Sequence, residues 1–354
     1  MTDDRLDDAY LRMHHAGPEW GEDRLTNHGP MAVETLIRRG YGDRVTMWVD
    51  RYLTRLDDLP TASAAIRDAT WREALGDGRR IADWTAYFGR QVDERPWRDV
   101  LALWWPRLLP GIVAGATHGV IRVGHAVRAL LGDDGDGSGP GVAELAHGLA
   151  FWAARFQGVP GTAAPAGRLD AATALQGIPA LAVQQGTVAT RLARLPGMAG
   201  WTSGLAALRA PATPDEAQAV LADLVTAGTR QYLSHGHASP VLLVHAATAP
   251  NAVLHTLPAL PQELWAPSLG AVWSAAAALS AAYVPQTGAA PALLPTLVDA
   301  NDTASVFDRA AEHGDEHVIK FTDTAVEVYE RSGDPAALAA AVRITTLIDP
   351  PRAA

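Results

Sequence analysis

The sequence of 354 residues has no cysteine, and its 29 basic residues include a single lysine, Lys320. The lack of cysteine excludes disulfides, thiolate nucleophiles, iron–sulfur clusters and cysteine-ligated zinc. A bound metal would need nitrogen or oxygen ligands from His, Asp, Glu or a less common group. In a chain so rich in arginine, the one lysine suggests a position where arginine cannot serve, although chance is the alternative.

Positive charge and nucleotide-binding motifs are also scarce. The net charge of −10 argues against a nucleic-acid or anionic-membrane surface. No G-x-G-x-x-G follows a strand pattern and no phosphate-binding loop occurs, so no motif supports NADPH. The acidic start has no apolar core, and prolines interrupt the uncharged stretch 264–297, which favours a buried helix around 268–283. We expect a soluble cytoplasmic protein.

Helical signals dominate, and no convincing series of alternating strands occurs. Thr213-Pro214-Asp215-Glu216 combines an N-cap, a proline at the first helical position and the glutamate of a capping box. Helical spacing occurs in 62–75, 96–108, 110–131, 142–157, 214–233, 240–257 and 303–331. We predict loops at the glycine-rich segments 132–141 and 158–167. We predict an all-α fold with a single irregular multi-helix domain, or alternatively two helical subdomains, 1–157 and 168–354.

Histidines are the informative polar residues. His235, His237, His245 and His255 lie in 231–298, where Glu263 is the only charged residue. A histidine in such a buried stretch must find hydrogen bonds or a metal, so each is either a satisfied core residue or a ligand.

The segment around His313–Thr324 is more specific. On a continuous helix, acidic residues from Asp308 to Glu330 would share one exposed face, while His317 would lie on the buried face with Lys320 beside it. A buried lysine is neutralised or lowers its pKa, and a neutral amine can act as a nucleophile, a base or a carbamate ligand. The alternative is a lysine paired with Glu316 or Glu327.

Two further candidates lie in the first half. Spacings of four and three place His118, Arg122 and His125 on one helix face, where Arg122 would suit a phenolate or carboxylate. His28, in Asn27-His28-Gly29-Pro30-Met31, stands at a helix entry that can aim its side chain inward.

These motifs, in this order, resemble the questin oxidase-like family. The resemblance rests on N-H-G-P-M at 27–31, H-G-x-x-R-x-x-H-A at 118–126, V-H-A-A-T-A-P at 244–250 and D-E-H-V-I-K at 315–320. It implies a helical fold and oxidation of anthraquinone-like aromatic polyketides by dioxygen. It also implies a mononuclear non-haem iron(II).

The ligands implied by the resemblance are His28, His118, His245, His317 and Lys320, the last as a carboxylated lysine. Arg122 stands where the family pattern often has histidine, so the choice between His118 and His125 stays open. Arg122 and His125 are our candidate catalytic residues, with Arg122 stabilising a developing oxyanion.

We therefore predict an iron-dependent oxygenase, a mono- or dioxygenase, that oxidises or cleaves a ring of a small aromatic polyketide. The alternatives are a metal-free, NADPH-supported Baeyer–Villiger-type oxidation and a non-catalytic helical binding protein for a pathway intermediate. We expect no nucleic-acid or membrane partner, and a homodimer stays open.

Overall fold

A computed structural model describes residues 4–22, 24–132, 139–295 and 302–351. Within them the chain forms two compact units. The first runs to Gly158 and includes His255–Pro261, and the second comprises Val159–Leu254 and the residues from Gln262 onward. The alternatives of one domain and two subdomains stay a prediction.

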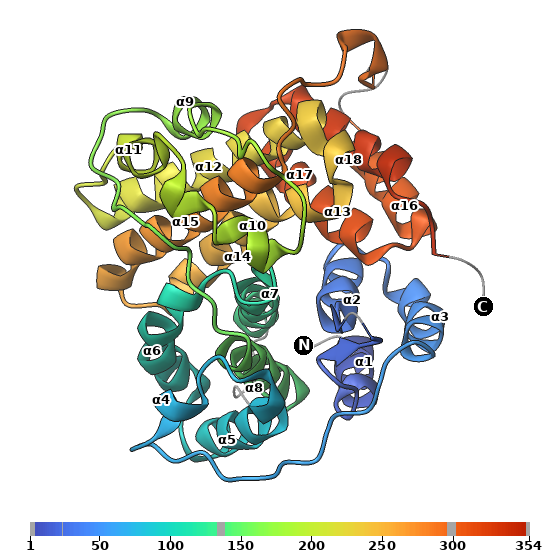
Figure 1. Cartoon of the computed structure of the whole chain (residues 1–354). Coiled ribbons are helices and arrows are strands. Elements are labelled where there is room, and N and C mark those ends of the chain that lie inside the picture. The colour runs from blue at the N-terminus through green and yellow to red at the C-terminus, as the bar shows by residue number, and fades with distance from the viewer. Residues whose placement is uncertain (1–3, 23, 133–138, 296–301, 352–354) are drawn as a thin grey trace. The chain divides into compact units, whose positions relative to one another are not determined.

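The first unit is helical apart from one short hairpin. Its strands β1 (Glu19–Trp20) and β2 (Leu25–Thr26) are antiparallel, and Glu19 pairs with Thr26. Helices α1, α2 and α3 lie next to one another, and α8 packs against α5 and α7 (Figure 1). Its helices are α1 (Asp4–Met13), α2 (Gly29–Arg38), α3 (Gly42–Leu53), α4 (Trp71–Ala74), α5 (Ile81–Glu94), α6 (Trp97–Leu108), α7 (His118–Gly132) and α8 (Pro140–Ala154), with 3-10 helices at Gly78–Arg80, Leu109–Gly111 and Leu257–Ala259.

The described part of the second unit consists of helices and connecting loops. Helix α12 packs against α15 and α18, and α17 packs against α16 and α18. Its helices are α9 (Ala171–Gln176), α10 (Val188–Leu192), α11 (Trp201–Ala207), α12 (Pro214–His235), α13 (Pro240–Leu243), α14 (His245–Thr256), α15 (Trp265–Tyr283), α16 (Thr303–His313), α17 (Glu316–Ser332) and α18 (Pro335–Leu347), with 3-10 helices at Leu195–Gly197, Gly236–Ala238, Gln262–Leu264 and Pro291–Leu293. The predicted all-α fold is confirmed.

The strongest capping signal of the sequence works as expected. Thr213 Oγ1 accepts a hydrogen bond from Glu216 N at 3.2 Å, and Glu216 Oε2 accepts one from Ala212 N at 2.7 Å. Helix α12 begins at Pro214, where the missing N–H costs no helical hydrogen bond. Asp334 likewise caps α18, and Ser239 precedes Pro240 of α13.

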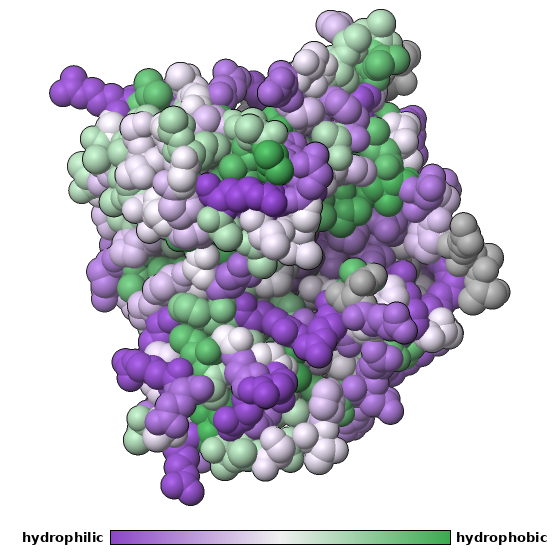
Figure 2. Space-filling view, viewed as in Figure 1, coloured by the Kyte–Doolittle hydropathy of each residue, from purple (hydrophilic) through white to green (hydrophobic). Residues whose placement is uncertain are grey.

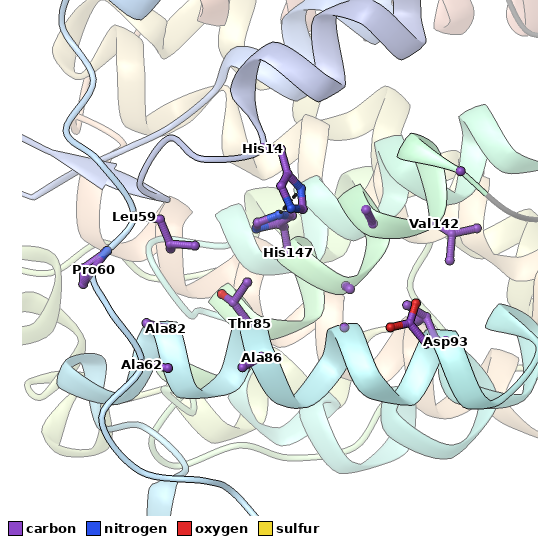
Figure 3. Close-up of a pocket in the computed structure, with 15 residues that line it drawn as sticks. His14, Leu59, Pro60, Ala62, Ala82, Thr85, Ala86, Asp93, Val142 and His147 are labelled. Carbon is purple, nitrogen blue, oxygen red and sulfur yellow. Dashed lines mark hydrogen bonds between the residues drawn. The ribbon is translucent and has the colours of Figure 1, made fainter.

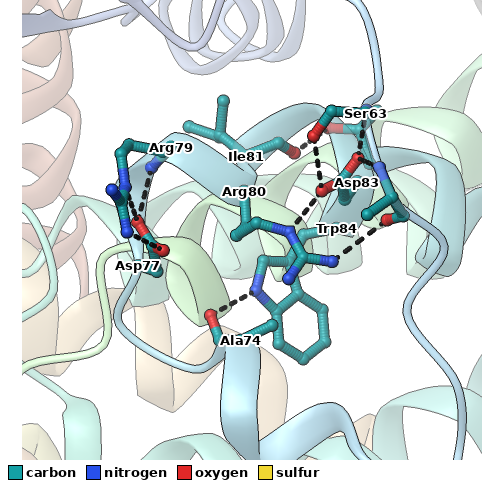
Figure 4. Close-up of polar contacts among 10 residues, drawn as sticks. Ser63, Ala74, Asp77, Arg79, Arg80, Ile81, Asp83 and Trp84 are labelled. Carbon is teal, nitrogen blue, oxygen red and sulfur yellow. Dashed lines mark hydrogen bonds and ion pairs between the residues drawn. The ribbon is translucent and has the colours of Figure 1, made fainter.

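The prediction of a helix over 62–75 is wrong, because only Trp71–Ala74 is α-helical there. Asp83 of α5 accepts hydrogen bonds from the backbone of Ser63 and Ala64, and the side chain of Arg80 also binds Asp83 (Figure 4). The carbonyls of Ala64 and Ile66, which in a helix would accept from N–H groups four residues later, accept instead from Arg80 Nη2 at 3.0 Å and Arg90 Nη2 at 3.3 Å. Distant side chains therefore override the local helical pattern.

Two other predicted helices are interrupted by left-handed backbone. Instead of one helix over 110–131, α7 begins at His118, after a turn in which Gly115, Ala116 and Thr117 all have positive φ. The predicted helix over 303–331 divides at Gly314, whose φ is 77°. Glycine adopts this conformation without a steric penalty, which makes it a common helix end.

The expected acidic face of that segment is also wrong in part. Glu316 and Asp323 are buried, whereas Asp308 and Glu312 are exposed. The break after α16 changes the helical phase, and α17 is covered by α12, α16 and α18. Similarly, the predicted helix over 240–257 is divided into α13 and α14.

One helical stretch among the described residues, Gln262–Tyr283, is long and apolar enough to cross a membrane. Its most apolar window is 67% buried inside the protein, as in the core helix of a soluble protein. On the face shown in Figure 2, hydrophilic and apolar residues are interspersed. The cytoplasmic location stays a prediction, and part of the predicted loop 132–141 lies outside the described residues.

Candidate functional site

His28 is held at the N-cap of α2, directly after the hairpin. Its backbone N–H donates to Tyr52 Oη at 2.6 Å. The preceding Asn27 binds on both sides, because its Nδ2 donates to Gly17 O and its Oδ1 accepts from Gly29 N. Pro30 follows in the first turn, so the chain enters α2 along a fixed path. The His28 side chain is 4% exposed.

His118 begins α7, and the strained turn before it determines its tautomer. Its Nδ1 lies within hydrogen-bond distance of Gly115 O, which can only accept. Nδ1 must therefore carry a proton, and in the neutral ring Nε2 carries the lone pair. A metal-binding histidine is commonly oriented in this way, by a carbonyl that binds its other ring nitrogen.

The turn is unusual because Thr117 is β-branched and has a φ of 76°. Left-handed backbone costs about 1–2 kcal/mol for a non-glycine residue. Such strain persists only where the surrounding structure imposes it, which happens most often at functional sites.

The two rings of this pair lie close together in the first unit. The His28 and His118 ring centroids are 4.5 Å apart, and both side chains are more than nine-tenths buried. Two buried imidazoles, one with a fixed Nε2 lone pair, are a suitable donor set for iron(II) or another divalent metal. The residues present therefore fit part of the implied metal site.

Arg122 and His125, the candidate catalytic residues, are engaged in ion pairs. Arg122 binds Glu144 of α8 through Nε at 2.5 Å and Nη2 at 2.8 Å. Its Nη1 has no hydrogen-bond partner among the residues that the structure describes. His125 Nδ1 lies 2.7 Å from Glu34 Oε2, and Arg128 also binds Glu34.

Glu34 thus links α2, which follows His28, to α7, which begins with His118. Burial alone would raise the pKa of Glu34, but Arg128 and His125 hold it far below its usual range. The carboxylate is therefore ionised at neutral pH and fixes the two helices that carry the pair.

The second unit contains three other predicted ligands, His245, His317 and Lys320. His245 is 1% exposed at the start of α14, and its ring centroid lies 6.2 Å from that of His317. His317 lies in the first turn of α17, and its Nδ1 is 3.5 Å from Asp315 Oδ1. Asp315, Glu316 and His317 each present a ligand atom within 4.8 Å of the others.

Asp315 also determines where α17 begins. Its Oδ1 accepts from the backbone N–H groups of His317 and Val318. Burial would raise the pKa of Asp315, but His317 and these N–H groups lower it below its usual value.

Lys320, one turn after His317, is 4% exposed. Burial lowers the pKa of Lys320 to about 8, against the opposing effect of Glu316 and Asp315. The amine is therefore far easier to deprotonate than a surface lysine.

The remaining candidate histidines have other surroundings. His235 Nδ1 lies 2.7 Å from Ser234 Oγ, and His237 is exposed. His313 Nε2 lies 2.9 Å from Ile348 O, and His255 belongs to the first unit. Sequence spacing could not separate these histidines from the grouped ones.

Sequence reasoning missed several residues around the candidates. Glu34 binds His125, Glu144 binds Arg122, and Asp315 lies beside His317, each through a helix distant in sequence or through a helix break. The adjacent Gly314-Asp315 was a usable signal, because glycine ends helices and aspartate begins them. Glu34 and Glu144 had no local signal.

Residues 31–131 match the sequence model of the family described as Questin oxidase-like. The resemblance to the questin oxidase-like family is confirmed over this segment. The match includes His118, Arg122 and His125 and covers less than a third of the chain. No curated protein matches the chain significantly. Because the family name denotes an oxidase, the match supports an oxidoreductase function.

Proposed function

We propose that this protein is a non-haem iron oxygenase that oxidises a ring of an aromatic polyketide with dioxygen. The observation that carries the proposal is the buried His28–His118 pair, in which the Gly115 carbonyl leaves His118 Nε2 with its lone pair. His118 lies inside the questin oxidase-like segment, which supports an oxidase.

The proposed ligand set joins residues from both units. Neither His28 with His118 nor His245 with His317 supplies the three protein ligands of a facial-triad iron site. We propose that the two pairs hold one iron and that Lys320, as its carbamate, adds an anionic oxygen. The carbamate would convert a costly buried cation into an anion that offsets the metal charge.

When bound, iron(II) would supply the activation of dioxygen. The protein residues would orient and desolvate the substrate and place charge beside it. Arg122, fixed by Glu144, has Nη1 available to donate to a phenolate or a developing oxyanion. His125, held by Glu34, would orient α7 or exchange a proton with the substrate.

The test is oxygen consumption with a hydroxyanthraquinone before and after chelation. We expect activity to be lost with the metal and restored by iron(II) but not by zinc. His118→Ala should reduce both iron content and turnover, whereas the exposed His237→Ala should change neither. Full turnover without metal would contradict the proposal and favour metal-free oxidation. Ligand binding without any turnover would favour a binding protein.

A further inference from the structure

A pocket of about 710 Å³ lies within the first unit, and none of the proposed iron ligands lines it. Its walls are the facing sides of α5 and α8, closed at one end by His14 and by the segment around Leu59 and Pro60 (Figure 3). The volume lies within the ~300–1,000 Å³ typical of small-molecule sites.

The long walls carry small side chains. Ala82, Ala86 and Gly89 recur along one face of α5, and Ala143 and Ala146 face them from α8. Together with Val92, Val142 and Thr85, these residues leave a slot whose sides are mostly apolar. Such a slot fits the two faces of a planar ring.

Two histidines form the polar end of the slot. His147 Nε2 of α8 lies 3.1 Å from His14 Nδ1, which follows α1, and both side chains face the pocket (Figure 3). Because each neutral imidazole has one donor and one acceptor, their mutual bond leaves one of each for a ligand. His147 is 6% exposed and His14 is exposed, so the pair joins a buried imidazole to one that solvent reaches.

The pair can bind an acidic oxygen. Burial lowers the pKa of His147, and the nearby Arg122 guanidinium lowers it further, so its ring is neutral at pH 7. A buried neutral imidazole can donate a hydrogen bond to an acidic oxygen without adding a buried charge of its own. Asp93, which is exposed at another part of the lining, would disfavour a second acidic group there.

We propose that this pocket binds a small planar aromatic acid, with its acidic oxygen on the His14–His147 pair and its ring between α5 and α8. The acidic oxygen can belong to a carboxylate or a phenol. The proposal does not rest on the iron centre, and its test needs neither metal nor turnover.

Calorimetric titration of the full-length chain tests the proposal. The probes are 2-naphthoate, 2-naphthol and naphthalene-2-methanol, which share the ring body but differ in acidity. We expect 2-naphthoate, 2-naphthol or both to bind at least tenfold more tightly than the alcohol. Whichever of these two probes binds more tightly identifies the acidic oxygen as that of a carboxylate or of a phenol. Equal affinity for all three would overturn the proposal.

Variants locate the binding. A Cβ on Gly89 meets no atom within 4 Å, so Gly89→Leu should fill the slot without a backbone clash and abolish binding, whereas Gly89→Ala should weaken it less. His147→Asn should remove the preference for acids. His237→Asn is the matched control, because His237 is exposed and belongs to the second unit.

Two results would overturn the site assignment. In the first, Gly89→Leu binds naphthoate as tightly as the unaltered chain. In the second, Zn²⁺ binds His14 and His147 stoichiometrically while naphthoate does not bind, which would make the pair a metal site.

Discussion

His118 shows how a single backbone group can prepare a side chain for metal binding. The Gly115 carbonyl fixes the proton on Nδ1, and the left-handed turn of residues 115–117 places that carbonyl. Thr117 is fully buried, and packing around it holds the turn in this strained conformation. The chemistry of the ring thus depends on three residues that contribute no ligand.

Gly115→Ala tests this dependence. Its φ is 54°, and an added Cβ would lie 2.8 Å from Phe151 Cζ. We expect a loss of at least about 1 kcal/mol in the free energy of unfolding, because left-handed alanine is strained. Iron content should also fall as the carbonyl moves. Ala116→Gly is the control, since it relieves strain at a φ of 57° and should keep iron and stability.

Glu34→Gln tests the buried ion pairs between α2 and α7. Removing one partner of a buried ion pair leaves its counter-charge unsatisfied, so we expect a loss of about 3 kcal/mol at pH 7. The lowered pKa of Glu34 means that its contribution is present above the unfolded-state value of about 4.3 and is lost as the pH falls below it. Urea unfolding at several pH values measures both effects.

In the Glu34→Gln variant, the free energy of unfolding should therefore fall less steeply as the pH decreases than it does in the unaltered chain. Glu94→Gln, at the exposed end of α5, is the control and should change stability little. Equal stability of both variants would show that the Glu34 ion pairs add nothing to the fold.

At the scale of elements, the division between α16 and α17 determines where His317 lies. Gly314 ends one helix in a left-handed conformation, and Asp315 caps the next through two backbone N–H groups. His317 therefore lies in a first turn beside a carboxylate, instead of in the middle of a continuous helix.

Asp315→Ala should cost about 1 kcal/mol through the lost cap and should also lower iron content. The matched control is Asp302→Ala, which removes the cap of α16, where Asp302 accepts from Ser305 N at 3.0 Å. We expect a similar loss of stability there with unchanged iron. If both variants keep full iron, the cap of α17 has no role in the proposed site.

Several elements could be predicted from the sequence because their signals are local. The capping box of α12 and the proline-started α13 and α18 depend on residues within one turn. The failures are non-local, since Arg80 and Arg90 bind the carbonyls of Ala64 and Ile66, and α17 is covered by α12, α16 and α18. His118 is buried and His317 is largely buried, while their role as ligands stays a prediction, and Glu34 and Asp315 act through packing that no spacing rule contains.

At the scale of the whole molecule, the proposed site depends on residues contributed by both units. A substitution of Lys320 tests this site most specifically, because arginine keeps the positive charge of lysine but cannot form a carbamate. Lys320→Arg should therefore lose iron and turnover. Full iron and full turnover in this variant would make Lys320 a structural ion-pair partner.

The central claim is that one iron is shared by histidines from both units, and iron content per chain tests it most directly. We predict about one iron per chain in the unaltered protein, purified without a histidine tag or added metal. His28→Ala and His317→Ala should each lose nearly all of it while remaining folded, and the exposed His237→Ala should retain it. If either ligand variant keeps its full iron, the histidines of the two units do not share a metal and the account is wrong.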